Sequence, residues 1–350
     1  MSAGFRAVQW NRKKLVYDAT LLGSVTAFIG AFMLVGARNH PPSDAAAWID
    51  LRINAFGTCA FVMLTIILSI GPLARLDRRF LPLLYNRRHF GVLAFLVALV
   101  HAWSVLAWFQ AVGAVPDLIT EFTANPKYLS FIGFPMKALG LFGLSVMFLL
   151  AATSHDYWLA VLTPRVWKSL HMALYVAYAV LAMHVALGVM QEDRRPLVPI
   201  LLAAAFAWVT GLHLAAAWRE WQADRRAPPG RENWIAVGPP HSIPDQRARI
   251  IAAPNGERIA VFRDGAQIGA LTNLCAHQNG PIGEGRIING CVTCPWHGYE
   301  YRLEDGCAPP PFTEKLATYR VRLKDGVVEV DSRPLPPGTK AAIMLAAGAG

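Results

Sequence analysis

The sequence predicts two structural parts: a bundle of six membrane-spanning α-helices over residues 1–218 and a small all-β domain over residues 233–332. Composition is the first reason, because 54% of the 350 residues are hydrophobic and 16% are charged, which is too apolar for an ordinary soluble protein. The second reason is a series of six apolar runs before residue 218. The third is a change of pattern after residue 232, where apolar and polar residues alternate in short segments.

Each apolar run holds about 20 residues, enough to cross a hydrocarbon core of about 30 Å as a helix. The first run lacks a small-residue cleavage site and is too long for the core of a signal peptide, so we expect a retained span. The six runs cover residues 15–35, 51–70, 90–112, 131–152, 170–189 and 197–217.

The distribution of basic residues predicts the orientation of the bundle. Six spans place both chain ends on one side, and the segments on that side hold fifteen Lys and Arg residues against six on the other. Because cytoplasmic loops carry such an excess, we expect a bacterial inner-membrane protein with both termini and the β domain in the cytoplasm. The net charge of +10 then reflects topology and does not indicate nucleic-acid binding. The fifteen residues are Arg6, Arg12, Lys13, Lys14, Arg75, Arg78, Arg79, Arg87, Arg88, Arg165, Lys168, Arg219, Arg225, Arg226 and Arg231.

Residues 219–232 are polar and rich in Pro and Gly, which predicts a linker. After the linker we expect short strands at residues 234–237, 257–263, 317–323 and 327–331. Three dipeptides are typical of hairpin turns whose two central residues have φ > 0, namely Asn255-Gly256, Asp264-Gly265 and Asp325-Gly326. Residues 333–350 are rich in Pro and then in Ala and Gly, so we expect a disordered tail.

Two motifs in the β domain carry the most specific chemistry. Cys275-Ala-His277 is followed by Cys294-Pro-Trp-His297. Two Cys and two His at this spacing are the ligand set of a Rieske [2Fe–2S] centre, in which two thiolates hold one iron and two imidazoles hold the other. We expect each pair at the tip of its own β-hairpin loop, with the two tips facing each other. Because imidazole is neutral, such a cluster is easier to reduce than one with four thiolates.

A zinc site is the alternative, because Cys291-Val-Thr-Cys294 is also a C-x₂-C pair. The usual structural zinc spacings, however, do not explain the C-x-H motif or the Cys-Pro-Trp-His-Gly run. The other cysteines, Cys59, Cys291 and Cys307, do not suggest a disulfide framework, which favours a reducing compartment for this domain.

Histidines within the apolar runs are functional candidates, because ionisable side chains are costly inside a membrane. His101 and His184 lie about 16 Å and about 20 Å from the cytoplasmic edge at the rise of an α-helix. His89 and His171 both lie near that edge. Two imidazoles at matching depth can bind haem iron from both sides, so we pair His101 with His184 and His89 with His171. The alternative is packing against backbone carbonyls, which we expect for His213.

Three segments of the helical part carry a family resemblance: Ser69-Ile-Gly-Pro-Leu-Ala-Arg-Leu, Arg87-Arg-His-Phe-Gly-Val-Leu-Ala-Phe with Leu99-Val-His101, and Ala152-Thr-Ser with Trp167-Lys-Ser-Leu-His171. Residues 15–217 resemble the ferric-reductase-like transmembrane domain, including its variant in the haem-b membrane subunit of the bacterial methionine sulfoxide reductase system. This resemblance implies that His101, His171 and His184 bind haem. His89 does not match that subunit, and it falls nearer the first His of the same helix in NADPH oxidases and eukaryotic ferric reductases.

Typical ferric reductases continue into flavin and nicotinamide domains, for which this sequence has neither the length nor a Gly-rich nucleotide fingerprint. The β domain takes that place, and it resembles Rieske ferredoxins and the Rieske domains of ring-hydroxylating oxygenases. Quinol-oxidising Rieske proteins have an additional disulfide-bonded Cys in each ligand loop, whereas the corresponding positions here lie within Gln278-Asn-Gly and Pro295-Trp296. The resemblance implies a cluster in the low part of the Rieske potential range.

These features predict a membrane-bound oxidoreductase that passes single electrons between a cytoplasmic [2Fe–2S] cluster and one or two b haems, with no residue acting as acid, base or nucleophile. We expect a cytoplasmic reductase or ferredoxin as donor, and quinone, ferric iron, oxygen or a periplasmic protein as acceptor. One alternative is a membrane-anchored component of a Rieske oxygenase system, although no second soluble domain is present for a 2-His-1-carboxylate iron site. Another is a redox sensor without turnover.

Overall fold

The structure is a computed structural model, and it describes residues 12–80, 83, 87–113, 136–154, 158, 166–167, 169–192, 197–226, 233–277, 280–296, 298–310 and 312–345. The chain forms two compact units. One comprises residues 9–71 and 86–213 and holds most of the helical bundle. The other comprises residues 1–8, 72–85 and 214–350 and holds the β domain.

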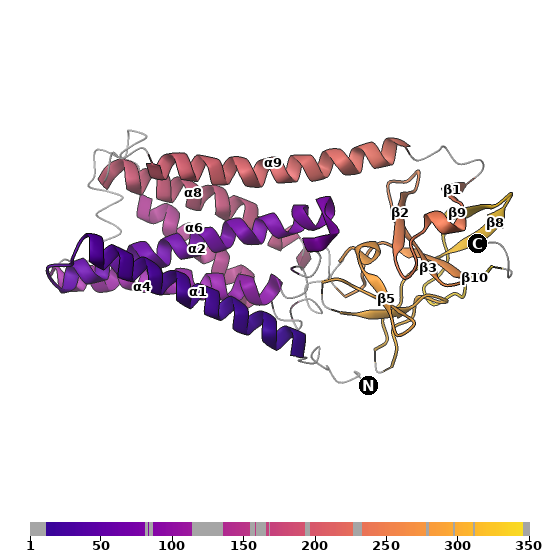
Figure 1. Cartoon of the computed structure of the whole chain (residues 1–350), viewed down its shortest axis with the longest axis horizontal. Helices are drawn as coiled ribbons and strands as arrows, with labels where there is room; N and C mark the ends of the chain where they lie inside the picture. Colours follow the sequence, from indigo (N-terminus) through magenta and orange to yellow (C-terminus); the bar gives the residue numbers. More distant parts are fainter. Residues whose placement is uncertain are drawn as a thin grey trace. The chain divides into compact units, whose positions relative to one another are not determined.

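Among the described residues, six long α-helices form the helical part (Figure 1). Five of them are long and apolar enough to cross a membrane, and the sixth, α6, is apolar but has 17 described residues. The chain is therefore a multi-pass integral membrane protein. The first part of the predicted fourth span, residues 131–135, lies outside the described residues. The helices are α1 (Arg12–Asn39), α2 (Ala45–Leu76), α4 (Arg87–Ala111), α6 (Met136–Ala152), α8 (Ala173–Glu192) and α9 (Leu197–Arg226).

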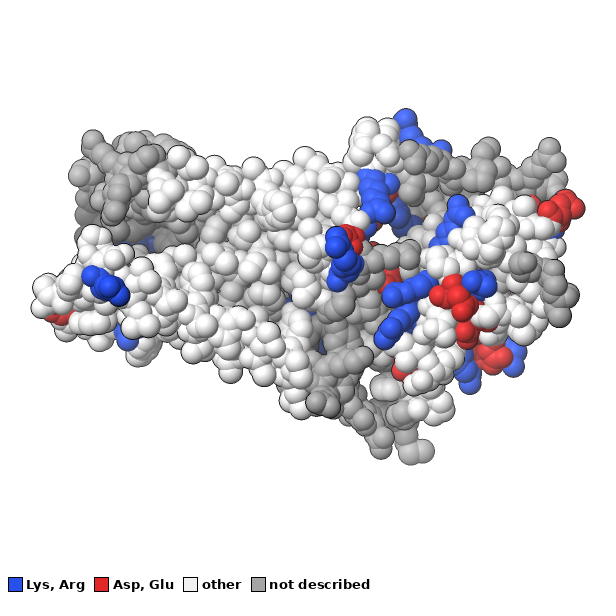
Figure 2. Space-filling view, viewed as in Figure 1, with Lys and Arg blue, Asp and Glu red and all other residues white. Residues whose placement is uncertain are grey.

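Helix α2 is the most buried of the spans. Half of its most apolar window is buried, against 6% in α1 and in α9, whose apolar side chains remain exposed as expected for contact with lipid. α2 begins before its apolar run because Asp44 caps it, with Oδ1 accepting a hydrogen bond from the N–H of Ala47 at 2.8 Å. On the face shown in Figure 2, the helical part carries few charged residues over most of its length.

The β domain contains two antiparallel sheets. The larger sheet has the strand order β1-β9-β8-β4-β3-β2, with β10 pairing with β4, and the smaller sheet has the order β5-β6-β7. The larger sheet consists of β1 (Trp234–Gly238), β2 (Ala248–Ala252), β3 (Arg258–Asp264), β4 (Gln267–Thr272), β8 (Thr318–Lys324), β9 (Val327–Pro334) and β10 (Ile343–Met344). The smaller sheet consists of β5 (Arg286–Ile288), β6 (Cys291–Thr293) and β7 (Glu300–Arg302).

The larger sheet separates two hydrophobic cores, and strand β3 contributes to both. Ile259 and Val261 pack in the first core, and Ala260 and Phe262 pack in the second core. Because both faces of β3 are covered, its sequence is a continuous apolar run rather than an alternating one. The second core also contains Val292 of the smaller sheet, together with Cys275 and Cys294.

The hairpin turns differ in detail from the prediction that both central residues have φ > 0. Asp325 and Gly326 do so, with φ of 49° and 75°. In the β3–β4 turn, Asp264 pairs with Gln267, so the central residues are Gly265 and Ala266, and only Gly265 has positive φ. A further turn with positive φ at both central residues joins β5 to β6 at Asn289-Gly290, where φ is 53° and 77°. This turn was not predicted from the sequence.

The predicted linker is wrong in its first part, because helix α9 continues to Arg226. The segment that follows the apolar run is rich in Glu, Gln, Ala and Arg, which are good helix formers, so the helix continues after the apolar residues end. Residues 227–232 lie outside the described residues.

The disordered tail predicted for residues 333–350 is also wrong as far as residue 345. Strand β9 extends to Pro334, and Ile343 of β10 pairs with Ile268 of β4. The hydroxyl of Thr318 donates to the carbonyl of Thr339 at 2.8 Å. Ile343 and Leu345 pack against the first core, so a few apolar residues at the right spacing order a segment whose composition indicated disorder. Residues 346–350 lie outside the described residues.

Candidate metal centres

The first predicted ligand loop follows β4 and leads to the smaller sheet. The N–H of Cys275 donates to the carbonyl of Gly280 at 2.9 Å, and Leu274 forms an isolated antiparallel bridge with Pro281. The buried Asn273 side chain accepts a hydrogen bond from the N–H of Gly283 at 2.7 Å. The loop is therefore closed at its base. Its flanking strands, β4 and β5, belong to different sheets, so the predicted hairpin is wrong for this loop.

The second predicted ligand loop is the hairpin between β6 and β7, as expected. The N–H of Cys294 donates to the carbonyl of Tyr299 at 2.8 Å, and the N–H of Gly298 donates to the carbonyl of Cys294 at 3.0 Å. Gly298 has φ of 72°, a conformation that favours glycine. These bonds place Cys294 at the base of the loop, beside the buried core.

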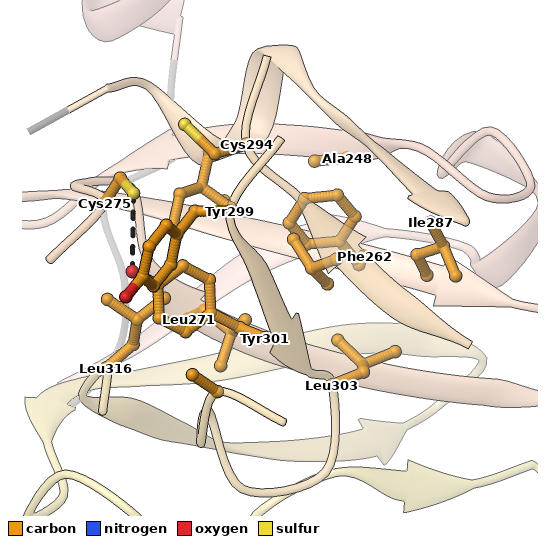
Figure 3. Packing of buried hydrophobic residues seen from close by; sticks show 14 residues of the cluster. Ala248, Phe262, Leu271, Cys275, Ile287, Cys294, Tyr299, Tyr301, Leu303 and Leu316 are labelled. Atoms are coloured by element: carbon orange, nitrogen blue, oxygen red, sulfur yellow. Dashed lines mark hydrogen bonds between the residues drawn. The ribbon is translucent and has the colours of Figure 1, made fainter. Parts of the chain in front are cut away.

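The two loops bring Cys275 and Cys294 into one buried core, where each is 1% exposed (Figure 3). The approach of the loops requires glycine at position 280. A Cβ on Gly280 would lie 2.8 Å from Sγ of Cys294 and 3.2 Å from the ring of Trp296. The packing of the two loops thus depends on the missing side chain of Gly280.

The hydroxyl of Tyr301 lies 3.4 Å from Sγ of Cys275, as the dashed line in Figure 3 marks. Burial alone raises the pKa of the Cys275 thiol, but hydrogen bonds with Cys294, Tyr301 and the backbone of His277 outweigh it and lower that pKa to about 6. Burial, and then the charge of Cys275, raise the pKa of Tyr301, so its hydroxyl keeps the proton that it donates. Cys275 is therefore favoured as a thiolate, the form that binds iron.

The structure describes one of the two predicted imidazole ligands. The ring of His277 stacks on that of Tyr299, with centroids 4.8 Å apart and planes 8° apart, and Tyr299 packs on Phe312. His297 lies outside the described residues. Within the described part of the chain, no group of three or more His, Cys, Asp and Glu side chains forms a metal site. The structure thus brings Cys275 and Cys294 together, and the complete ligand set stays a prediction.

The zinc alternative finds no support in the position of Cys291. Cys291 lies on β6 and is half-buried, whereas the next residue, Val292, is fully buried in the core that contains Cys275 and Cys294. Burial raises the pKa of the Cys291 thiol, which disfavours a thiolate there. Cys291 therefore does not belong to the buried thiol pair.

In the bundle, the rings of His101 on α4 and His184 on α8 lie together, with centroids 6.3 Å apart and planes at 81°. Nδ1 of His101 bonds to the carbonyl of Ile53 on α2 at 3.0 Å, and Nδ1 of His184 bonds to the carbonyl of Met136 on α6 at 2.7 Å. Because a carbonyl only accepts, each Nδ1 carries the proton and each Nε2 keeps its lone pair. The structure therefore brings together the pair that was predicted from depth, in the tautomer that binds a metal through Nε2.

His171 and His89 have different surroundings. Nδ1 of His171 donates to the carbonyl of Trp167 at 3.0 Å, and the two rings stack with centroids 3.7 Å apart. Among the described residues, the buried Nε2 of His171 has no hydrogen-bond partner. In contrast, Nδ1 of His89 lies 2.7 Å from Oδ2 of Asp18 on α1, a partner that was not predicted from the sequence.

His213 is placed as a packing residue, as expected. Its Nδ1 donates to the carbonyl of Val209 at 2.9 Å, and its Nε2 lies 2.9 Å from the hydroxyl of Tyr175. Both ring nitrogens are thus engaged. Tyr301 was not among the residues predicted from the sequence. The available signal is a pair of tyrosines at alternate positions after the second ligand loop, Tyr299 just before β7 and Tyr301 within it, whose ring centroids lie 5.7 Å apart.

The donor atoms at both places fit iron cofactors. A buried pair of cysteines, one favoured as a thiolate, matches the sulfur half of a [2Fe–2S] ligand set. A pair of imidazoles in an apolar bundle, each with Nδ1 bonded to a carbonyl and Nε2 able to bind a metal, is a donor set that would hold a haem iron.

Comparisons with known proteins assign both parts of the chain. Residues 233–320 match the model of the Rieske [2Fe-2S] domain, and residues 21–182 match the ferric reductase like transmembrane component. The anthranilate 1,2-dioxygenase ferredoxin subunit of Burkholderia cepacia is 41% identical over 76 residues, which cover 21% of this chain and 68% of that protein. The protein-methionine-sulfoxide reductase heme-binding subunit MsrQ of Brucella ovis is 28% identical over 204 residues, covering 58% of this chain and 83% of that protein.

Among solved structures, the ferredoxin of carbazole 1,9a-dioxygenase from Nocardioides aromaticivorans IC177 is 19% identical, covering 29% of this chain and 100% of that chain, with a TM-score of 0.27. The Rieske match begins at residue 233, beside the first strand at Trp234, and the ferric-reductase-like match lies wholly within the helical part. The chain therefore belongs to the Rieske [2Fe–2S] family through its C-terminal β domain, which is joined to a ferric-reductase-like transmembrane component of the MsrQ-like kind.

Proposed function

We propose that this protein transfers single electrons between a Rieske [2Fe–2S] cluster held by Cys275, His277, Cys294 and His297 and a b-type haem held by His101 and His184. The observation that carries the proposal is the placement of the two intramembrane imidazoles, 6.3 Å apart and each fixed by a carbonyl at Nδ1. The names of the two relatives support it, because one is a ferredoxin subunit and the other a heme-binding subunit.

The residues around both sites hold and tune the cofactors, and none of them has to act as acid, base or nucleophile. When bound, the cluster and the haem each supply a one-electron carrier. His101 and His184 would each supply an imidazole to the haem iron, and a haem held by two imidazoles suits electron transfer rather than oxygen activation. The buried core around Cys275 and Cys294 excludes water, and the Tyr301 hydroxyl offers a hydrogen bond to one thiolate.

We further propose that the Rieske domain and both chain ends lie in the cytoplasm, on the basis of the excess of basic residues on that side. A cytoplasmic reductase or ferredoxin would then be the donor. Both relatives are named as subunits of larger systems, a dioxygenase and a methionine sulfoxide reductase, which supports a separate redox partner here as well. A reporter enzyme fused after Gly350 tests the orientation, and activity on the periplasmic side would reverse it.

Spectroscopy of the purified full-length chain tests the proposal directly. We expect a Rieske EPR signal from the reduced protein, a low-spin b-haem spectrum, and an iron content equal to the sum of acid-labile sulfide and haem. His101→Ala and His184→Ala should each abolish the low-spin haem signal, while His213→Ala, whose ring nitrogens are already engaged, should retain it. Full haem in both ligand variants would overturn the membrane half of the proposal.

A kinetic comparison tests whether the two cofactors are connected. The chain is mixed with an NADH-dependent flavoprotein reductase, and reduction of the haem is followed by its α-band. We expect the Cys294→Ser variant, which lacks the cluster, to show haem reduction at least about tenfold slower, an effect of about 1.4 kcal/mol or more on the barrier. Equal rates in both proteins would mean that electrons reach the haem without passing through the Rieske domain.

A further inference from the structure

The two intramembrane histidines are held by the same local arrangement, repeated in the two halves of the bundle. His101 on α4 bonds to the carbonyl of Ile53 on α2, which lies 48 residues earlier. His184 on α8 bonds to the carbonyl of Met136 on α6, also 48 residues earlier. The same interval of 83 positions separates Ile53 from Met136 and His101 from His184.

A glycine stands four residues after each accepting carbonyl, at the point where the imidazole lies against the helix. A Cβ on Gly57 would lie 2.8 Å from Nδ1 and 3.0 Å from Cε1 of His101. A Cβ on Gly140 would lie 2.9 Å from Cε1 and 3.0 Å from Nδ1 of His184. These two glycines are again 83 positions apart. The shortest distance at each position, 2.8 Å at Gly57 and 2.9 Å at Gly140, is one that real Cβ atoms essentially never show. Each imidazole therefore lies in a space that exists because one residue of the facing helix has no side chain.

The 83-residue interval extends to the core around the histidines, so the two arrangements belong to one repeated framework. Ala94 on α4 and Ala177 on α8 are both fully buried. Leu64 on α2 and Met147 on α6 are 3% and 4% exposed. Equivalent positions of the helix pairs α2–α4 and α6–α8 thus face the interior, with one histidine contributed by each pair.

We propose that Gly57 and Gly140 are positioning residues for the haem, acting through the imidazoles of His101 and His184. Each glycine lets the ring approach the helix closely enough for Nδ1 to reach the carbonyl one turn earlier, which sets the tautomer and the direction of Nε2. This inference rests on the proposed function, because it assigns the purpose of the arrangement to haem ligation. A side chain at either position displaces the ring, lengthens the Nδ1 hydrogen bond and turns Nε2 away from the iron.

The chain offers matched controls for the alternative that these glycines only let helices pack closely. Gly143, three residues after Gly140 on α6, is equally crowded, but its Cβ would lie 2.5 Å from Cδ2 of Leu181 rather than near a histidine. Gly91 on α4 has no atom within 4 Å of its Cβ position. Gly143→Ala therefore reproduces the crowding, and Gly91→Ala reproduces the change of residue in a membrane helix.

The experiment compares the four alanine variants in the purified full-length protein, with the Rieske EPR signal as the internal measure of intact protein. For Gly57→Ala and Gly140→Ala we expect haem affinity to fall roughly 10- to 100-fold, the usual effect of removing support from a metal ligand. The haem that remains should show shifted low-spin EPR g-values and a shifted midpoint potential. Gly143→Ala and Gly91→Ala should keep the wild-type g-values and potential. Unchanged spectra in both Gly57→Ala and Gly140→Ala, or the same change in Gly143→Ala, would overturn the proposal.

A double-mutant cycle covers the case in which Gly57→Ala fails to accumulate, and it does not depend on haem. In a His101→Ala background the ring is absent, so Gly57→Ala should cost no further thermal stability and should accumulate normally. Equal destabilisation with and without His101 would assign Gly57 to helix packing alone and overturn its positioning role. The haem content of the wild-type protein tests the proposed function separately. If the wild type contains no haem but Gly57→Ala is destabilising only when His101 is present, the proposed haem is wrong and the contact between glycine and imidazole still stands.

Discussion

The hydroxyl oxygen of Tyr301 lies 3.4 Å from the sulfur of Cys275. A hydrogen bond donated to a ligand thiolate stabilises the reduced cluster more than the oxidised one, because the reduced cluster carries more negative charge. We therefore expect Tyr301→Phe to lower the reduction potential of the Rieske centre, by about 59 mV if the bond favours the reduced state tenfold. Protein-film voltammetry or an EPR-monitored titration measures the shift.

Tyr319→Phe is the matched control for that measurement. Tyr319 is as buried as Tyr301, but it packs in the other core of the domain and donates to Glu257 at 3.4 Å. Its replacement should leave the potential of the cluster unchanged. A similar shift in both variants, or none in Tyr301→Phe, would show that the tyrosine hydroxyl does not act on the cluster.

Cys294→Ser should remove the Rieske EPR signal and leave the haem spectrum in place. Cys294 shares a buried core with Cys275, and the histidine pair lies in the other compact unit, so loss of one site should not unfold the other. Cys291→Ser is the control, since Cys291 lies outside that core, and it should retain the cluster. Zinc in stoichiometric amount, lost from both variants, would favour the C-x₂-C alternative.

His171→Ala should lower the haem content of the protein, whereas His89→Ala should not. Nε2 of His171 is buried without a hydrogen-bond partner among the described residues, and a buried polar atom of this kind is costly unless it binds something. Nδ1 of His89 already lies against Asp18. The haem content of each variant, measured per mole of protein as the pyridine complex, tests this prediction. Equal losses in the two variants would restore the pairing of His89 with His171.

Removal of residues 336–350 should destabilise the Rieske domain, because Ile343 pairs with β4 and packs against the first core. Ile343 is half-buried, so its packing contributes about half of the roughly 1.5–3 kcal/mol that complete burial of such a side chain supplies. For a domain of this size we expect a fall in Tm of at least about 4–8 °C, measured by scanning calorimetry. The control is removal of residues 346–350, which should leave the Tm unchanged. Equal Tm values for both truncations would restore the prediction of a structureless tail.

The sequence by itself determined the two-part organisation and the apolar spans, and it singled out Cys275 and Cys294, which the structure places in one buried core. Runs of about 20 apolar residues have few structures other than a membrane helix, and hydropathy is a local property that needs no tertiary contact. The motifs Cys275-Ala-His277 and Cys294-Pro-Trp-His297 are also recognisable locally. A metal-ligand set restricts both the residue types and their spacing. The depth of each histidine in the membrane could also be estimated from the sequence, because the rise per residue of an α-helix is constant. That depth predicted the pairing of His101 with His184, whose rings lie together in the structure.

Only the tertiary structure decided which neighbour each side chain faces. His89 and His101 are 12 residues apart, about 120° around an ideal helix, so they point to different helices, His89 to Asp18 on α1 and His101 to Ile53 on α2. The sequence contains no signal for those neighbours, because helix rotation is set by the packing of the whole bundle. The contact of Tyr301 with Cys275 and the pairing of Ile343 with β4 are of the same kind. Both join segments that are distant in the chain, and a strand pairing depends on the edge available to it rather than on its own composition.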